Sequence, residues 1–216
     1  MKKQFAVIGL GRFGTSVATT LAQLGYDVLA VDSDEARVEE LAEVATHAVQ
    51  ADATDIEVLK QLGIRNFDVV VVSIGHNMEA SILVTLILKE MGVKQVIAKA
   101  GSELHSRVLK RVGADRVVFP ERDMGARVAH NLVASNIIDY IELAPNYSLL
   151  EITPPCEMFD KTIRELNLRT DYGINVLAIK RGNEIKVSPG ADDVIKKGDI
   201  LVVVGENGDL KQLEEE

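Results

Sequence analysis

The first 120 residues alternate short apolar, β-branched runs with longer segments in which apolar residues recur every three or four positions. Buried parallel strands produce the first pattern and amphipathic helices the second, and their alternation is typical of a parallel sheet covered by helices on both faces. The pattern therefore predicts an α/β, doubly wound, Rossmann-like domain over residues 1–120. Its six strands are expected at 5–8, 28–31, 47–50, 69–73, 95–98 and 117–119.

Glycines and capping residues indicate where the helices of this domain begin and end. A glycine directly follows a helical pattern at four places, where the left-handed C′ position favours it: Gly25, Gly63, Gly92 and Gly113. At the opposite helix ends, we expect Ser33 to cap the second helix. Thr54 and Glu57 have the spacing of a capping box for the third helix.

The strand-helix rhythm is lost after residue 120. One more helix is predicted within 121–136, as a crossover or linker, and a small α+β domain over 137–216. The strands of this second domain are predicted at 149–153, 176–180, 185–187 and 200–204, and the three glutamates at 214–216 are interpreted as a solvated tail.

Composition narrows the class of protein. With 47% hydrophobic and 26% charged residues the chain can form a globular core, and its net charge of −9 disfavours binding to nucleic acid or anionic lipid. The longest apolar runs, 69–74 and 82–88, are far below the ~20 residues that span a bilayer. We therefore expect a cytoplasmic chain that does not insert into the membrane, with Cys156 as a buried structural thiol.

A glycine motif at residues 5–14 indicates phosphate binding. In G-x-G-x-x-G after a strand and before a helix, Gly9 allows a tight turn, Gly11 a close approach of a pyrophosphate, and Gly14 close helix packing. Asp32, at the end of the second strand, is placed to accept hydrogen bonds from ribose hydroxyls and would repel a 2′-phosphate. The alternative is that these glycines serve only a tight turn.

Other polar residues are expected at the same carboxyl edge of the sheet. Residues 52–54 follow the third strand, Ile74 and Gly75 the fourth, and Lys99 ends the fifth. Together with Arg12 inside the glycine loop, Lys99 suits terminal phosphates better than a nicotinamide riboside. The alternatives are that Arg12 is a solvated surface residue and that Thr54 is only a helix cap.

The sequence offers no convincing catalytic set. The four histidines are scattered without metal-ligand spacing, and no G-x-S-x-G, H-E-x-x-H or Walker A pattern occurs. A dehydrogenase needs a proton-transfer group beside its nicotinamide, and none is evident. We therefore predict a protein that is not an enzyme and uses a nucleotide as a signal; the alternative is a small NAD(H)-dependent oxidoreductase.

Several separated motifs, in order along the chain, carry a family resemblance. They lie at 5–14, 47–54, 63–67, 113–116, 120–124, 172–174, 178–180 and 188–189. Through them the whole chain resembles the regulator-of-K⁺-conductance (RCK) family, also called KTN or TrkA-type proteins, and especially the cytosolic subunits of bacterial Ktr potassium transporters. Thr15 departs from the pattern, because close relatives often carry another glycine there.

The resemblance implies dimers that assemble into an octameric ring beneath a membrane-embedded K⁺ transporter subunit, peripheral to the inner face of the cell membrane. ATP, ADP or NAD(H) would bind the glycine loop, with Arg12 and Lys99 on phosphates and Asp32 on the ribose. Arg12 would contact its own or a neighbouring protomer's nucleotide. The implied nucleotide-binding residues are Gly9, Gly11, Arg12, Phe13, Gly14, Asp32, Ser33, Asp52, Ala53, Thr54, Ile74, Gly75 and Lys99.

Two further sites are implied by the resemblance. Glu121 matches a carboxylate that helps to hold Mg²⁺, Ca²⁺ or Na⁺ near the γ-phosphate; its alternative role is a favourable charge in the first turn of a helix. The second domain resembles a cyclic di-AMP receptor at a dimer interface, although a plain domain surface explains its pattern equally well. The matching residues are Ile163, Leu166, Asn167, Leu168, Arg169, Tyr172 and Pro189.

Overall fold

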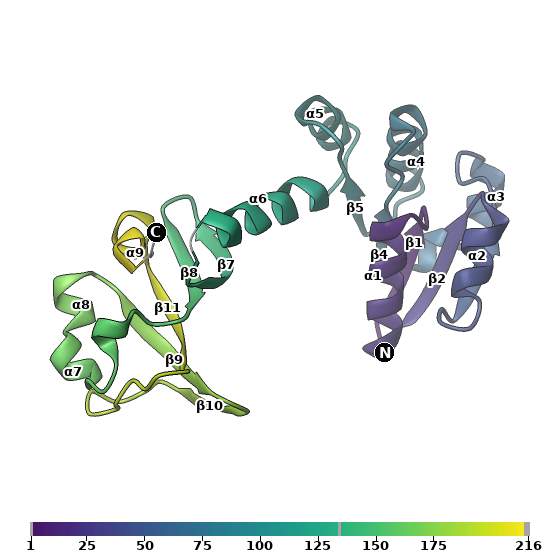
Figure 1. Cartoon of the computed structure of the whole chain (residues 1–216). Coiled ribbons are helices and arrows are strands. Elements are labelled where there is room, and N and C mark those ends of the chain that lie inside the picture. Colours follow the sequence, from purple (N-terminus) through teal and green to yellow (C-terminus); the bar gives the residue numbers. More distant parts are fainter. Residues whose placement is uncertain (1, 134, 214–216) are drawn as a thin grey trace. The chain divides into compact units, whose positions relative to one another are not determined.

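A computed structural model describes residues 2–133 and 135–213, and the chain divides into two compact units, Met1–Glu121 and Arg122–Glu216. Figure 1 shows a sheet with helices in each unit. The tail interpreted from residues 214–216, and position 134 of the predicted crossover helix, lie outside the described residues. Among the described residues, no helix combines the length and apolar character that crossing a membrane requires.

The first unit is the predicted α/β domain. Its elements are β1 (Gln4–Ile8), α1 (Arg12–Gln23), β2 (Asp27–Asp32), α2 (Glu35–Leu41), β3 (His47–Gln50), α3 (Ile56–Gln61), η1 (Ile64–Asn66), β4 (Val69–Val72), α4 (Met78–Glu90), β5 (Gln95–Lys99), α5 (Glu103–Arg111) and β6 (Arg116–Val118). The strands are all parallel, in the order β3-β2-β1-β4-β5-β6. This order confirms the doubly wound fold, with its reversal between β1 and β4.

Each face of this sheet has its own core. Leu59, Leu88 and Leu109 bring α3, α4 and α5 onto one face, and each is 0% exposed. Ala18 and Leu41 bring α1 and α2 onto the opposite face. Truncating one of these buried leucines to alanine would cost about 2 to 5 kcal/mol of stability.

The helix ends in this unit were predicted with partial success. Gly25, Gly63, Gly92 and Gly113 have φ angles of 81°, 63°, 80° and 106°, so the predicted left-handed positions are confirmed. The two caps were wrong by one residue each. Asp34 rather than Ser33 caps α2, and Asp55 rather than Thr54 caps α3, each accepting the N–H two residues further on at 3.1 and 2.8 Å. A carboxylate in this position also interacts favourably with the helix dipole.

The crossover helix α6 (Pro120–Val133) begins in the first unit and leads into the second. The remaining elements are β7 (Ile137–Ala144), β8 (Tyr147–Ile152), η2 (Cys156–Met158), α7 (Ile163–Leu166), α8 (Leu168–Asp171), β9 (Asn175–Arg181), β10 (Glu184–Val187), β11 (Ile200–Glu206), α9 (Asn207–Leu210) and η3 (Lys211–Leu213). The antiparallel sheet has the order β10-β9-β11-β8-β7. Leu150, Leu201 and Val203 on one of its faces pack with Leu168 and Leu210 into a separate core.

Two features of the second unit differ from expectation. Strand β7 was not predicted, because its register shifts at two places and five of its eight residues are exposed, which breaks the alternation of apolar and polar positions. Cys156 is exposed rather than buried, since the short turn η2 that it begins buries Met158 instead.

Candidate functional site

The turn between β1 and α1 brings the start of α1 against the end of β1. Gly9 has a φ of +93°, and a Cβ there would lie 3.0 Å from the backbone of Ser73 and Ile74. A Cβ on Gly14 would lie 1.9 Å from the carbonyl oxygen of Gly9. Only glycine fits these two positions, so the motif is required for the close packing of helix on strand. That packing places the helix N-terminus at the carboxyl edge of the sheet.

The N-terminus of α1 is open and has no side-chain cap. Gly11 is the N-cap residue, its position forms no side-chain hydrogen bond to the helix, and the first turn contains no acidic residue. A Cβ built on Gly11 would meet no atom within 4 Å. The helix then continues for 12 residues, and the N–H of Thr15 bonds to the Gly11 carbonyl at 2.9 Å. Free N–H groups at the positive end of a helix, beside open space, fit an anion such as phosphate.

Asp32 is fixed beside the glycine turn. It is 8% exposed, and its two carboxylate oxygens accept the N–H groups of Leu10 at 2.6 Å and Asp34 at 2.9 Å. The Arg37 guanidinium lies 3.6 Å away. These partners stabilise the buried charge, and each oxygen keeps a further lone pair that can accept a hydroxyl hydrogen bond.

The end of β3 lies at the same edge. The N–H of Ala51 donates to the Asp32 carbonyl at 2.9 Å, which ties this end to β2. Asp52 is exposed, and its Oδ1 accepts the Thr54 hydroxyl at 2.7 Å and the Thr54 N–H at 2.9 Å, which lower its pKa. Ala53 is buried. Thr54 is therefore a partner of Asp52 rather than a helix cap.

On the other side of the glycine turn, the end of β5, the loop after β4 and the start of α6 bring a lysine and a glutamate together. Lys99 at the end of β5 forms an ion pair with Glu121, and its side chain is only 14% exposed. Its Nζ lies 3.2 Å from the position that a Cβ on Gly75 would take, and Ile74 packs against the core beside it. The hydrogen bond from Lys99 lowers the pKa of Glu121, and the charge of Arg12 lowers it further.

The remaining loop residues differ in exposure. Arg12 is exposed, and within the described ranges no hydrogen bond or ion pair holds it. Phe13 is half-buried against the core beneath α1 and α2. Ser33 is exposed, and its carbonyl accepts the Gln50 side-chain N–H at 3.2 Å. The loop is thus anchored by Phe13, whereas Arg12 keeps a free guanidinium.

Ser73, directly after β4, was not singled out by any motif. It is 5% exposed, and its hydroxyl finds no hydrogen-bond partner in the described part of the chain. That hydroxyl lies 3.0 Å from the position of a Cβ on Gly14, so it belongs to the helix-strand contact at the turn. Its place at the end of a central parallel strand was the only signal that could have found it.

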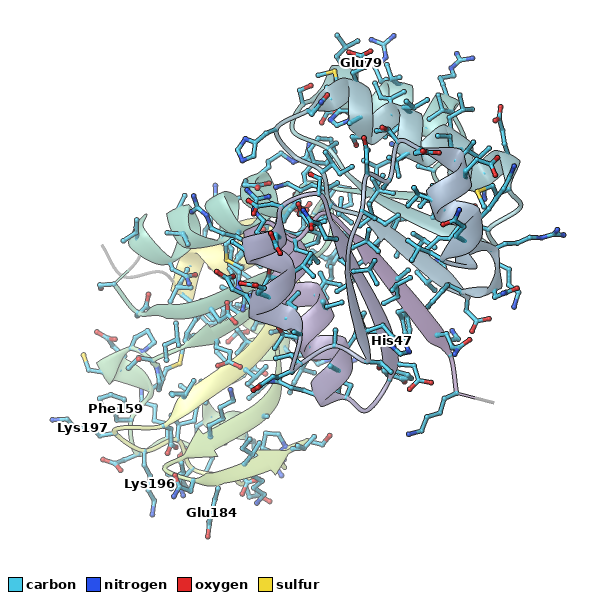
Figure 2. The ribbon with its side chains drawn as sticks, turned by 90° about the vertical axis from the view of Figure 1, so that its right-hand side faces the viewer. His47, Glu79, Phe159, Glu184, Lys196 and Lys197 are labelled. Carbon is cyan, nitrogen blue, oxygen red and sulfur yellow. The ribbon has the colours of Figure 1, made fainter. Side chains whose placement is uncertain are left out.

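The four histidines lie on separate segments of the chain, and His76 directly follows Gly75 in the loop after β4. Figure 2 shows His47, at the start of β3, at the opposite end of the first unit from Glu79 in the first turn of α4. His105 is 2% exposed, and burial lowers its pKa. The described residues contain no group of three or more His, Cys, Asp or Glu that could hold a metal ion. Glu121 therefore belongs to no such cluster within the described residues.

In the second unit, the residues matched to a cyclic di-AMP receptor lie on two short helices and one loop. Asn167, with a φ of 45°, joins α7 to α8. Leu168 is 2% exposed and packs in the core, so its side chain is not on the surface. Ile163 and Leu166 are half-buried against the same core. Two of these apolar residues thus remain partly accessible and one does not.

The polar part of this set is exposed. Arg169 and Tyr172 are both exposed, the latter by 37%. The loop that contains Pro189 reaches α7, because the N–H of Arg164 donates to the Ala191 carbonyl at 2.7 Å. The structure therefore brings the loop beside α7. Figure 2 shows Glu184 on β10 and Lys196 and Lys197 before β11 near one end of this unit.

Comparison with known proteins extends over the whole chain. Residues 5–120 match the TrkA-N domain and residues 148–216 match the TrkA-C domain. The Ktr system potassium uptake protein C of Bacillus subtilis strain 168 is 52% identical over 214 residues, which cover 99% of this chain and 97% of the relative. Protein A of the Ktr system in the same organism is 46% identical, over 99% of this chain and 96% of the relative.

Solved structures share the fold. The RCK domain of GsuK superposes with a TM-score of 0.71 at 18% identity, over 100% of this chain and 48% of that one. The GsuK channel bound to NAD gives 0.70 at 18% identity, over 100% of this chain and 40% of that one. This chain therefore has the RCK fold and spans half or less of the length of these structures.

Proposed function

Because the chain belongs to the TrkA-type regulator-of-K⁺-conductance family, we propose that it is a nucleotide-sensing regulatory subunit of a Ktr-type potassium uptake system. The observation that carries the proposal is the open, uncapped N-terminus of α1, which lies beside Asp32 and near Lys99 at one edge of the sheet. ATP and ADP would favour different conformations of the assembly to the extent that their affinities for those conformations differ.

The first unit offers a complementary group for each part of an adenine nucleotide. Free N–H groups of α1 would bind the diphosphate, with Arg12 and Lys99 as cations for the terminal phosphates. Asp32 would accept the ribose hydroxyls, and Asp52 to Thr54 would lie toward the adenosine end. Structures of the similarly folded GsuK channel bound to NAD and to ADP support a nucleotide ligand, and NAD(H) is the second candidate.

A regulatory role without catalysis is favoured by the groups around the turn. Asp32 already accepts two N–H groups, and Lys99 is already paired with Glu121. Neither is a free acid or base beside the place a nicotinamide would take. The alternative, an NAD(H)-dependent oxidoreductase, would need such a group from elsewhere.

The partner in this proposal is a membrane-embedded K⁺ transporter subunit, with the chain at the inner face of the membrane. Copies of the chain would form dimers that assemble into an octameric ring. Exposed apolar side chains recur every four residues along α6, at Met124, Val128 and Leu132, which are 54%, 48% and 80% exposed. Such a stripe on a helix supports its burial against another copy. A cation at Glu121 would then take its other oxygen ligands from the nucleotide and from that copy.

Cyclic di-AMP is proposed as a second ligand, on the surface of α7 and α8. Arg169 is exposed and would contact a phosphate, and Tyr172 and Ile163 offer partly accessible apolar area. The loop at Pro189 borders this surface through its contact with α7. Binding here would inhibit K⁺ flux by changing the conformation of the second unit.

Mass spectrometry of the ligand released from freshly purified protein tests the nucleotide proposal. AMP, ADP or ATP in the released fraction would support it, and calorimetric titration of stripped protein would then rank their affinities. NAD(H) as the only ligand would contradict regulation by ATP and ADP, and an assay for hydride transfer would then separate an NAD(H)-sensing regulator from the oxidoreductase. Absence of any nucleotide, together with no heat on adding ADP, would contradict the proposed function.

A further inference from the structure

Lys99, a proposed cation for the nucleotide phosphates, already has an anionic partner within its own chain. Its Nζ forms an ion pair with Glu121, 22 positions away in the sequence. The Lys99 side chain is 14% exposed and lies over Gly75, where the space of a missing Cβ is 3.2 Å from Nζ. A phosphate that binds Lys99 must therefore share or replace the carboxylate of Glu121.

The two charged side chains of this ion pair differ in how well water can solvate them when the pair is broken. The Glu121 side chain is 68% exposed, so its carboxylate can return to water at little cost. The lysine is mostly buried, and a buried ammonium without an anionic partner is unfavourable. An incoming phosphate supplies that partner with a larger charge and more acceptor oxygens. Exchange of the carboxylate for a phosphate is therefore physically favoured.

The position of Glu121 connects this exchange to another part of the chain. Glu121 is the second residue of α6 and the last residue of the first unit. Its pairing with Lys99 ties the first turn of α6 to the end of β5. Loss of this pairing would free the start of the helix that leads into the second unit.

Resting on the proposed function, we infer that Glu121 is an intramolecular counter-ion of Lys99 that a nucleotide phosphate displaces. The exchange makes Glu121 a determinant of affinity for phosphate-bearing ligands. When a nucleotide occupies the glycine turn, the loss of this ion pair also releases the first turn of α6.

The substitution Glu121→Gln in the full chain tests this inference by calorimetric titration with ADP in the presence of EDTA, which removes any contribution of a bound cation. Removing the competing charge is expected to tighten ADP binding about three- to tenfold, and to leave the affinity for adenosine unchanged. Glu79→Gln is the matched control, because Glu79 is an exposed glutamate in the first turn of α4 and its loss changes the net charge equally. No gain in affinity over this control would overturn the inference.

A double-mutant cycle and a second readout separate displacement from a general charge effect. Glu121→Gln should have no effect on ADP affinity once Lys99 is replaced by Gln, because the competition is gone. In the wild-type chain, ADP should increase hydrogen exchange of the amides at 121–124, in the helical turn that the ion pair fixes. Equal gains in both backgrounds, or unchanged exchange, would contradict displacement. Failure of wild-type protein to bind ADP would instead contradict the proposed function itself.

Discussion

At the residue scale, Asp32 holds the most constrained charge at the edge where nucleotide binding is proposed. Its side chain is 7% exposed, and its two oxygens accept the N–H groups of Leu10 and Asp34, with the Arg37 guanidinium nearby. The glycine turn and Asp32 depend on each other, because the Leu10 N–H belongs to that turn. These hydrogen bonds stabilise the negative charge of Asp32 beside the helix N-terminus where phosphate is proposed to bind.

Asp32→Ala should weaken every ribose-bearing ligand together. Loss of hydrogen bonds to a charged acceptor costs about 1.5 to 3 kcal/mol, or roughly 10- to 100-fold in affinity for ADP, ATP and NADH alike. Calorimetric titration measures this, with Asp34→Ala as the control. That control removes the side-chain cap of α2 and should lower stability by about 1 kcal/mol while leaving affinity intact. Normal ADP and NADH affinity in Asp32→Ala would remove the ribose assignment.

At the element scale, a buried carboxylate joins β9 to the turn before β11. Asp199 is 1% exposed and accepts two hydrogen bonds from Arg181, both at 2.7 Å, and one from the Lys196 N–H at 2.8 Å. The hydrogen bonds from Arg181 hold the pKa of Asp199 below its ordinary value. A lowered pKa in the folded state means that the stabilisation is complete above the unfolded pKa of about 3.9 and is lost as pH falls through the folded pKa.

We therefore expect the second unit to lose stability below about pH 4, in part through Asp199. Asp199→Asn should reduce that acid dependence and destabilise the unit at pH 7 by on the order of 2 kcal/mol, since a buried amide cannot accept all the hydrogen bonds that Arg181 and Lys196 donate to the carboxylate. Hydrogen exchange of the β9 and β11 amides in the full chain, measured against pH, reports both effects. Asp192→Asn, which removes an exposed ion pair with Arg164, should leave stability almost unchanged because water screens that pair. An equal effect of the two substitutions would refute the assignment.

The surface of α7 and α8 carries its own prediction. Arg169→Ala should weaken cyclic di-AMP binding at least about tenfold, because the phosphate would lose its charge-assisted partner. Equilibrium dialysis with labelled cyclic di-AMP measures the change. Arg164→Ala is a suitable control, since Arg164 lies on the same helix pair but is engaged by Asp192 at 3.0 Å. Equal binding by both variants and the wild type would exclude this surface.

Elements with a regular burial pattern could be predicted from the sequence, whereas irregular ones could not. The parallel strands bury nearly continuous apolar runs, such as the four valines of β4, and glycines mark the helix ends between them. Strand β7 was missed because its bulges disturb the alternation. The pairing of Lys99 with Glu121 links two separate elements, so no local pattern contains it. The same holds for the hydroxyl of Ser73, whose neighbours only the fold brings together.

At the scale of the whole molecule, the chain combines a doubly wound unit and an antiparallel unit joined through α6. The match to Ktr potassium uptake proteins covers 99% of its length, so it includes both units and the connecting helix. The acidic net charge of −9 suits a protein that reaches a membrane through a partner rather than by binding anionic lipid. In the proposed function, the nucleotide at the first unit controls a pore that the chain itself does not form.

The most direct test of that claim is K⁺ flux through the chain reconstituted with its membrane subunit in proteoliposomes, compared in ATP and in ADP. Wild-type protein should give different flux in the two nucleotides. Arg12→Ala should still bind ADP but show a smaller ATP-to-ADP difference, because the exposed guanidinium would no longer distinguish the number of phosphates. Equal flux in ATP and ADP for the wild type, or full discrimination in Arg12→Ala, would contradict the account.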